Sequence, residues 1–409
     1  MFKKAMVLAG GNDQIELIKS LRKRYNGIEI ILVDINPNVR AKEYADKMLV
    51  ISTMDMEAVT MAAKQEGIDL ILVNCGDQPL RTMAYVSEKL NLPCYLTYQQ
   101  SELLTNKRKM KEIMVSSGIP TSKHHRFNIK SKPETDGLKF PLVVKPADNN
   151  GSKGVIKVYN DDELIAAIAE SRKYTMGGDL ILEEYKEGTE YSIEAFIKNG
   201  EPILVFPSQN TKIEGRNSFT ICKNQYVPQL SDALKHSILA IIKKIGSAFK
   251  IDNTPLLIQL IVGSDGEINV IEFAPRTGGG SKLFFIRRMT GVDIIENLLD
   301  ISEGKEPDIT VSPSKESAAI CYLYAQKGIF QGFKNLTKLS EEGIIEEMYL
   351  YKPYGTNILS SDYSSDRPAG ILVTATNDEA LKAKINLIDR EIGILNENGL
   401  DIMIHGIFN

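Results

Sequence analysis

Cysteine, histidine and long apolar segments are scarce in this chain of 409 residues. Its four cysteines lie far apart, so their spacing favours neither a disulfide framework nor a cysteine metal site. The longest apolar runs, such as residues 28–35, are interrupted by charge and fall well short of the roughly 20 residues that a membrane helix needs. Of the four histidines, His124 and His125 lie in a polar connection, and the sequence offers no convincing catalytic nucleophile.

An excess of basic residues is also missing. The 49 Lys and Arg residues face 53 Asp and Glu residues, whereas a nucleic-acid binder usually carries a basic excess or stripe. Lys3 and Lys4 precede an apolar run too short for a secretory signal. The length predicts two to three domains. We therefore expect a reduced, cytoplasmic protein that binds neither nucleic acid nor membranes.

The first hundred residues alternate between two patterns. Short apolar runs predict buried strands, and apolar residues at three- and four-residue intervals predict helices. Repeated strand–helix units imply right-handed crossovers and a mostly parallel sheet. The predicted strands are residues 5–9, 28–34, 48–52 and 70–74, and the predicted helices are residues 14–25, 55–66 and 80–90.

Gly10 and Gly11 follow the first predicted strand, and Asp34 ends the second. A glycine turn with an acidic residue about 20 positions later is typical of dinucleotide sites. Residues 12–14 lack the third glycine of that pattern, so a tight strand-to-helix turn is the alternative interpretation.

The rest of the chain changes character. A helix is predicted over 102–116, a connection over 121–139, and then an α+β pattern with helices near 161–173 and 231–249. Residues 206–228 are predicted to form a polar insertion with few strands. Beyond about residue 310 we expect short strands, one helix over 378–398 and a terminal strand over 401–408.

A loop of small residues, 148–155 (DNNGSKGV), separates two predicted strands. Such a loop lets backbone N–H groups close over an anion, although an ordinary hairpin turn has the same composition. Lys145 ends the preceding apolar strand, where a lysine either reaches solvent or is held by an anion. Lys107 opens a basic helix, and a solvated helix face is the alternative there.

Two groups of carboxylates stand at strand ends. Glu183 and Glu184 close one strand and Glu190 opens the next, where they could accept hydrogen bonds from a nucleotide or form a charged surface hairpin. Glu272 lies within an apolar strand, which is costly unless the carboxylate meets a cation. Mg²⁺ suits it, with Gln259 on the neighbouring strand. Arg276 follows on a short loop, where it could stabilise charge during phosphoryl transfer.

In this order, the two lysines, glycine loop, carboxylate pair, metal carboxylate and arginine resemble the ATP-grasp superfamily. The resemblance is closest to the carboxylate–amine ligases, which include glycinamide ribonucleotide synthetase, carboxyaminoimidazole ribonucleotide synthetase, biotin carboxylase and amino-acid ligases. It implies a mixed α/β and α+β fold: a Rossmann-like pre-ATP-grasp domain (1–98), a two-subdomain ATP-grasp domain (99–310, with a mobile lid at about 120–190) and a C-terminal β-rich module (311–409).

The resemblance also implies a role for each matching residue. Lys107 and Lys145 would neutralise the α- and β-phosphates, and the loop Asn150, Gly151, Ser152, Lys153 and Gly154 would fold over the β- and γ-phosphates. Glu183 would face the adenine amino group, Glu184, Tyr185 and Lys186 the adenine edge, and Glu190 the ribose. Gln259 and Glu272 would bind Mg²⁺, or Mn²⁺ in its place, and Arg276 would stabilise the acyl phosphate.

Two positions depart from the family pattern. Ala274 stands where the family usually has a metal-binding Asn, and Gln259 where many relatives have Glu or Asp. Both changes weaken the protein's hold on a second metal ion, so the number of ions stays open.

The implied reaction joins a small-molecule carboxylate to an amine with ATP, by an enzyme that could act as a homodimer. An ATP-dependent carboxylase and a non-catalytic ATP-binding module are the alternatives. Substrate identity stays open at this point. Residues that could contact the substrate are Gly10, Gly11, Asp77, Lys212, Arg216 and Gly279, and a mobile surface loop or a helix start is the alternative for several of them.

Overall fold

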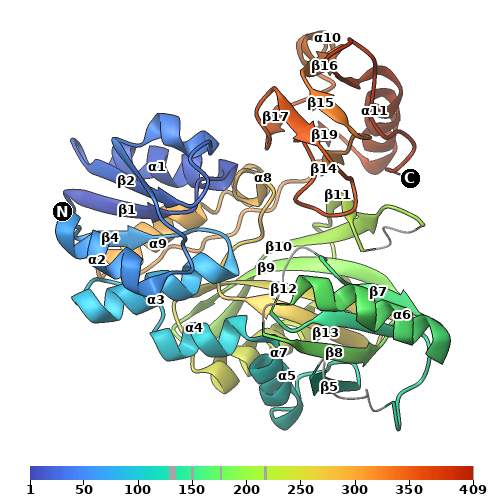
Figure 1. Ribbon diagram of the computed structural model, residues 1–409, viewed down its shortest axis with the longest axis horizontal. Helices are drawn as coiled ribbons and strands as arrows, with labels where there is room; N and C mark the ends of the chain where they lie inside the picture. The colour runs from blue at the N-terminus through green and yellow to red at the C-terminus, as the bar shows by residue number, and fades with distance from the viewer. Residues whose placement is uncertain (129–134, 149–151, 176, 216–218, 409) are drawn as a thin grey trace.

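The computed structural model describes residues 1–128, 135–148, 152–175, 177–215 and 219–408 (Figure 1). Asn150, Gly151 and Arg216, three residues predicted to bind ligands, lie outside the described residues. Within the described ranges, no helix is both long enough and apolar enough to cross a membrane.

The N-terminal sheet confirms the predicted strand–helix alternation. Its four parallel strands lie in the order β3-β2-β1-β4. Strands β1 and β4 and the centre of β2 are buried, which explains their continuous apolar sequences. The elements are β1 (Lys4–Leu8), α1 (Asn12–Arg24), β2 (Glu29–Asp34), η1 (Arg40–Tyr44), β3 (Lys47–Val50), α2 (Met56–Glu66), β4 (Leu70–Leu72) and α3 (Asp77–Leu90).

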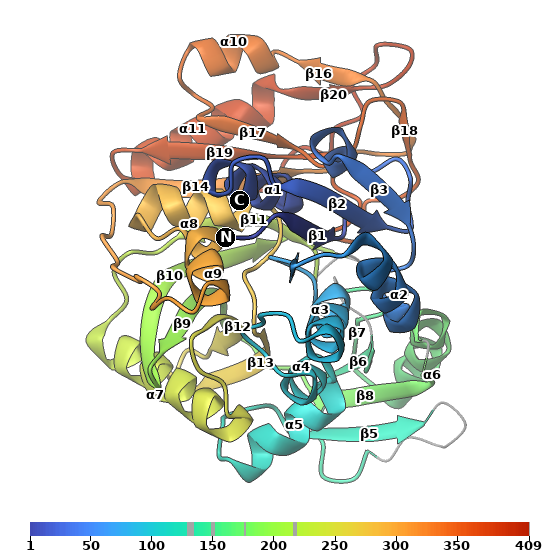
Figure 2. The same cartoon turned by 90° about the vertical axis from the view of Figure 1, so that its left-hand side faces the viewer.

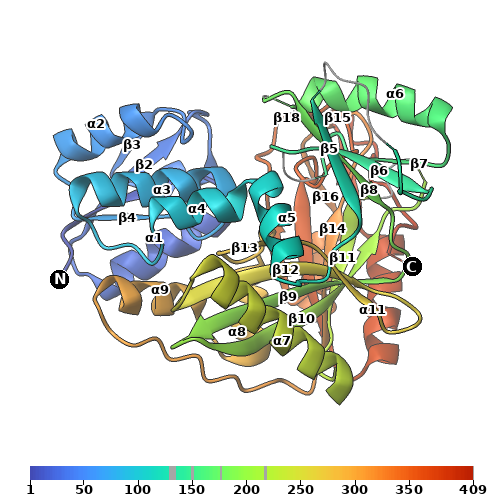
Figure 3. The ribbon, with the colours of Figure 1, turned by 90° about the horizontal axis from the view of Figure 1, so that it is seen from below.

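Two helices stand where one was predicted over 102–116. Helix α4 (Tyr98–Thr105) ends before Asn106, and α5 (Lys107–Ser116) begins directly after it. The Asn106 side chain accepts hydrogen bonds from the backbone N–H groups of Arg108 and Lys109, both at 3.1 Å, and so caps α5. Figure 3 shows the two helices running from the N-terminal layer toward β5. The cap places Lys107 in the first turn of α5.

A small antiparallel sheet, in the order β5-β8-β6-β7, carries helix α6 and has a hydrophobic core of its own. Leu142, Val144, Leu164 and Leu182 belong to that core. Its elements are β5 (His124–Asn128), β6 (Leu142–Pro146), β7 (Ile156–Val158), α6 (Asp161–Ser171), η2 (Arg172–Tyr174) and β8 (Asp179–Glu184). We call it the small sheet.

The large sheet is antiparallel and has the order β13-β12-β9-β10-β11-β14-β19-β17. Strand β14, from the C-terminal third, pairs with β11, so one sheet continues across residue 310 (Figure 2). Its strands are β9 (Thr189–Lys198), β10 (Glu201–Lys212), β11 (Ile221–Tyr226), β12 (Thr254–Val262), β13 (Ile268–Ala274), β14 (Ser317–Leu323), β17 (Glu347–Leu350) and β19 (Ala369–Ala375). The accompanying helices are α7 (Asp232–Phe249), α8 (Lys282–Thr290) and α9 (Ile294–Ser302).

The prediction of a strand-poor insertion at 206–228 is wrong, because β10 and β11 pair through much of it. Several of its polar residues are buried in the sheet and bond to one another: the Asn224 amide donates to Ser208 Oγ and Asn210 Oδ1 at 3.0 and 2.7 Å. Polarity therefore gave the wrong impression of a surface segment.

The C-terminal prediction is also partly wrong. Helix α11 (Asp378–Glu391) stops short of residue 398, and β20 (Gly393–Leu395) follows it. Over 401–408 there are isolated bridges, Leu395 with Asp401 and Ala325 with Met403, in place of the predicted strand. A Cβ at Gly393 would lie 2.2 Å from Asp401 Oδ2, so the close approach of this segment requires glycine. The remaining elements are β15 (Gly328–Phe330), β16 (Gly332–Lys334), α10 (Leu336–Glu341) and β18 (Thr356–Ile358).

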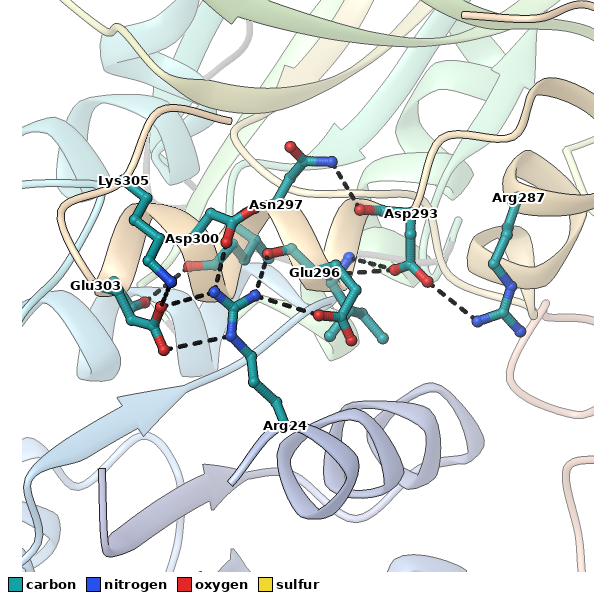
Figure 4. Close-up of polar contacts among 11 residues, drawn as sticks. Arg24, Arg287, Asp293, Glu296, Asn297, Asp300, Glu303 and Lys305 are labelled. Atoms are coloured by element: carbon teal, nitrogen blue, oxygen red, sulfur yellow. Dashed lines mark hydrogen bonds and ion pairs between the residues drawn. The ribbon is translucent and has the colours of Figure 1, made fainter. Parts of the chain in front are cut away.

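An ion-pair cluster joins the N-terminal domain to α9 (Figure 4). Arg24, at the end of α1, contacts Glu296 at 3.2 Å and Glu303 at 2.7 Å, and also pairs with Asp300. Hydrogen bonds from Arg24 and Lys305 outweigh burial and lower the pKa of Glu303 to about 2. Because the Arg24 side chain is only 16% exposed, its charge depends on these carboxylates.

We expect Arg24→Met to lower the free energy of unfolding by about 1–3 kcal/mol near pH 7, because three carboxylates lose their shared cation. The pKa of Glu303 is depressed, so its contribution is complete above about pH 4.5 and is lost as the pH falls toward 2. The difference between wild type and variant should shrink over that interval in thermal unfolding. Lys23→Met, at an exposed position of the same helix, is the control; a loss independent of pH would contradict the assignment.

Candidate active site

One pocket brings together most of the predicted site residues. It encloses about 990 Å³, part of it open to solvent, and side chains from the small sheet, the large sheet and α5 line it. The predicted residues that line it are Lys107, Lys145, Ser152, Glu183, Glu184, Tyr185, Lys186, Glu190, Lys212, Gln259 and Glu272. The remainder of the lining is largely apolar and includes Val143, Val155, Ile221 and Ile271, as is usual for a small-molecule site.

Two lysines reach the pocket from different elements. Lys107 stands in the first turn of α5, and Lys145 lies in β6, whose five residues are all buried. Lys145 as a whole is only 5% exposed, so the strand holds its side chain in a largely dry environment.

The Glu183 carboxylate stabilises the buried Lys145 side chain by pairing with it. It pairs with Lys145 and, at 3.1 Å, with Lys111 one turn after Lys107. Burial raises the pKa of Glu183, but the two ammonium groups outweigh it and bring the pKa to about 2. Burial also lowers the pKa of Lys111 below its ordinary value. The Glu183 carboxylate is thus engaged by lysines, and its expected contact with adenine stays a prediction.

Gln259 and Glu272 lie directly opposite each other on β12 and β13, as their positions on one hairpin predicted. The Glu272 carboxylate is 35% exposed and contacts Lys107 Nζ at 3.2 Å. Burial by itself would raise the pKa of Glu272. The nearby Lys107 and Lys145 outweigh burial, so the pKa of Glu272 lies below its ordinary range.

The side-chain oxygens of Gln259 and Glu272 suit a metal ion that needs few ligands from the protein. No group of three or more His, Cys, Asp or Glu side chains in the described ranges could hold a metal ion. One carboxylate and one amide oxygen fit Mg²⁺ that takes its other ligands from phosphate and water. Ala274, two residues after Glu272, offers no ligand.

Arg276 lies beside the main pocket, in a smaller cavity whose lining also includes Lys107 and Glu272. Its Nε donates to Asp77 Oδ1 at 2.6 Å, and both side chains are about 15% exposed. Burial lowers the pKa of Arg276, but Asp77 more than compensates and the guanidinium stays charged. Asp77, predicted to face the substrate, thus holds Arg276 in place.

Other predicted residues lie outside the main pocket. Gly10 donates its N–H to Asp34 at 2.8 Å, and a Cβ there would clash with Val39 at 2.2 Å, so a tight turn accounts for both Gly10 and Asp34. Gly11 precedes α1, whose first residue, Asn12, contacts Ser281 at 3.4 Å. Lys153 and Gly154 continue the loop after Ser152. Gly279 is the exposed residue of an otherwise buried turn before α8.

A buried polar network starts from the pocket wall. Glu190 pairs with Lys212 and accepts from Asn210 at 2.8 Å, and Asn210 and Ser208 both accept from Asn224. Lys212, expected to reach the substrate, pairs with Glu190 in the main pocket.

The network continues to the turn before α8. Lys282 donates to Ser208 Oγ at 3.0 Å and Ser192 Oγ at 2.8 Å, and lies 3.6 Å from Glu194. Glu194 accepts the backbone N–H of Gly278 at 3.2 Å. Burial raises the pKa of Glu194 and lowers that of Lys282.

Sequence reasoning missed two of these polar residues, Lys111 and Glu194, and each left a signal. Lys111 stands four residues after Lys107, which puts both on one side of a helix. Glu194 lies inside the apolar strand β9, the same signal that identified Glu272 on β13. The partners of Lys282 come from β9 and β10, which sequence distance does not reveal.

Comparisons with known proteins agree with this geometry. Residues 138–283 match the family model described as "ATP-grasp domain". The carbamoyl phosphate synthase large chain of Clostridium beijerinckii is 24% identical over 69% of this chain and 26% of its own length. The L-arginine-specific L-amino acid ligase of Bacillus subtilis is 26% identical over 62% of this chain and 63% of its own.

The chain therefore spans less than two thirds of these curated relatives. Among solved structures, the L-amino acid ligase from Bacillus licheniformis superposes with a TM-score of 0.80 at 21% identity, over 97% of this chain and 99% of that one. The matched residues 138–283 contain Lys145, Glu183, Glu190, Gln259, Glu272 and Arg276. Residues 138–283 are thus similar to the ATP-grasp domain family, and the chain shares its fold with the Bacillus licheniformis ligase.

Proposed function

We propose that this protein is an ATP-dependent ligase that activates a carboxylate as an acyl phosphate and joins it to an amine. One observation carries the proposal: a single pocket brings Lys107 and Lys145 opposite the Gln259–Glu272 pair, with Arg276 in the adjoining cavity. Cations fixed by α5 and β6 suit a polyphosphate, and an arginine beside it suits the reacting end. The substrates are a small carboxylic acid, such as an amino acid, and a small amine.

The nucleotide would lie along the pocket. The lysines would contact the α- and β-phosphates, and the 152–154 loop would close over the phosphate end. The segment of Glu184, Tyr185 and Lys186 would border the adenine. The Glu190 carboxylate, oriented by Asn210 and Lys212, is suited to accept hydrogen bonds from ribose hydroxyl groups.

Binding of metal and nucleotide should be coupled through Lys107. Four lysines and four glutamates line the pocket, so their charges balance without a ligand. When a phosphate takes up Lys107, the Glu272 carboxylate loses its 3.2 Å ion pair and needs another cation. Glu272 and Gln259 would then hold Mg²⁺ that arrives with ATP. When bound, the ion would neutralise charge on the phosphates.

In this reaction the protein would act mainly by positioning the substrates and less by covalent catalysis. A substrate carboxylate oxygen attacks the γ-phosphorus, the bond to the β–γ bridging oxygen breaks, and ADP leaves. The amine nitrogen then attacks the acyl carbon, phosphate departs with the bonding electrons, and the nitrogen loses a proton. Arg276, oriented by Asp77, can stabilise negative charge on the transferred phosphoryl group and the acyl phosphate.

The ligase activity itself is tested by ADP release from the full chain with ATP, Mg²⁺ and pairs of amino acids or other small carboxylates and amines. We expect release that requires both a carboxylate and an amine. Release that requires bicarbonate instead would favour an ATP-dependent carboxylase. Tight ATP binding with no release in any mixture would favour a binding module.

Lys145→Ala should weaken ATP binding by about 10- to 100-fold, because a charge-assisted hydrogen bond to phosphate is lost. Calorimetric titration with ATP and Mg²⁺ measures the effect. Lys173→Ala is the control, since Lys173 is exposed and pairs with Glu170 on the surface of the same subdomain. An unchanged ATP affinity in Lys145→Ala would contradict the phosphate assignment.

Glu272→Gln should reduce Mg²⁺-dependent ADP release by about 100-fold or more and raise the Mg²⁺ concentration needed for half-maximal rate. The reason is that the amide cannot neutralise a cation. Glu267→Gln, at the exposed turn of the same hairpin, should leave both quantities unchanged. Wild-type Mg²⁺ dependence in Glu272→Gln would place the metal elsewhere.

A further inference from the structure

Arg367 lies against the glycine turn that leads from Arg276 into α8. It precedes β19, and its guanidinium carbon lies 3.9 Å from the ring centroid of Tyr322 and 5.1 Å from that of Tyr351. A Cβ on Gly280 would come within 2.5 Å of Arg367 Nη2 and 2.9 Å of Tyr322 Oη. Glycine at 280 is therefore what allows a guanidinium to rest on this backbone.

The two tyrosines fix the guanidinium without neutralising it. Tyr322 donates its hydroxyl to the Gly280 carbonyl at 3.2 Å, and Tyr351 contacts Ser281 Oγ at 3.3 Å. Burial raises the pKa of Tyr322 to about 12, and it also raises that of Tyr351, so both rings are uncharged at neutral pH. Tyr322 covers one face of the guanidinium, and Arg367 also makes a side-chain hydrogen bond with Tyr324. The remaining N–H groups can bind a ligand.

Arg367 has no ion-pair partner among the described residues, although it is partly buried. The nearby carboxylate, Asp13, is 7% exposed and accepts the backbone N–H groups of Gly280 and Ser281 at 3.3 and 3.1 Å. Asp13 thus accepts hydrogen bonds from the turn, and no carboxylate in the described part of the chain is hydrogen-bonded to Arg367. A partly buried cation without one is costly unless a ligand supplies it.

Gly279, the residue before Gly280, leaves space for a ligand. Gly279 is exposed, and a Cβ there would meet nothing within 4 Å. Arg276 and Gly280 are four residues apart, at most about 14 Å even in an extended chain. A small molecule over Gly279 can therefore approach both Arg276 and Arg367.

We infer that Arg367 binds a carboxylate that does not react, on an amino-acid substrate whose reacting group points toward Arg276. The inference rests on the proposed ligase function and names the substrate class. The planar N–H edge of one guanidinium matches a carboxylate monoanion in a bidentate contact. A phosphate dianion would call for a second cation, and the carboxylate of Asp13 nearby opposes a second negative charge.

The test measures binding of amino acids to the full chain in the presence of ADP and Mg²⁺ by calorimetry. Each standard L-amino acid is compared with its α-carboxamide, which keeps the side chain but lacks the charge. We expect at least one amino acid to bind wild type about 30-fold more tightly than its amide. Arg367→Gln should remove that difference by weakening the acid alone, and leave ADP affinity within twofold.

Two further variants separate binding from folding. Arg390→Gln changes an arginine whose side chain is 71% exposed and should leave all affinities unchanged. Gly279→Leu fills the open space without backbone strain and should abolish amino-acid binding while ADP still binds.

The inference is overturned if no amino acid binds wild type, or if Arg367→Gln weakens acid and amide equally. Binding of glycerol 3-phosphate that Arg367→Gln abolishes would likewise overturn it, in favour of a phosphate site. If the acid–amide difference depends on Arg367 but no ADP is released in any mixture, the ligase proposal fails and the carboxylate site stands.

Discussion

The main pocket depends on one buried carboxylate held between two buried lysine side chains. Lys111 is 3% exposed, Lys145 5% and Glu183 7%, so water hydrates these three side chains very little. Glu183 comes from β8, Lys145 from its neighbour β6, and Lys111 from α5. The cluster therefore joins a helix outside the small sheet to two of its strands, and gives Lys145 an ion-pair partner within an apolar strand.

The site was predictable from sequence wherever a charge interrupts an apolar strand. Lys145 and Glu272 are of this kind, and both line the pocket. The order of the motifs along the chain pointed to a family. No single segment did so, since each one alone has an ordinary structural explanation. The N-terminal sheet was predictable for a related reason: buried parallel strands are short and continuously apolar, and amphipathic helices separate them.

The misses share a physical cause, which is that polar groups can satisfy one another inside the protein. Residues 206–228 look like a surface insertion because Ser208, Asn210 and Asn224 are polar, yet cross-strand hydrogen bonds bury them in β10 and β11. Asn106 splits a continuous helical pattern because its side chain caps α5. Arg367 carried no sequence signal, because its surroundings come from Tyr322 and Tyr351, 45 and 16 residues earlier.

Hydrogen bonds among buried polar residues also connect the pocket wall to the glycine turn before α8. Glu190 on the pocket wall is linked through Asn210, Asn224 and Ser208 to Lys282, and Lys282 lies beside Glu194, which holds the Gly278 amide. Each group satisfies its neighbour, so moving one would leave another unpaired in a nearly dry interior, at a cost of about 1–3 kcal/mol. Because the Gly278 amide follows Arg276 by two residues and precedes the open space at Gly279, the network fixes the turn relative to the pocket wall. In a reaction that relies on positioning, that fixed relation is what would hold a γ-phosphate and a carboxylate in line.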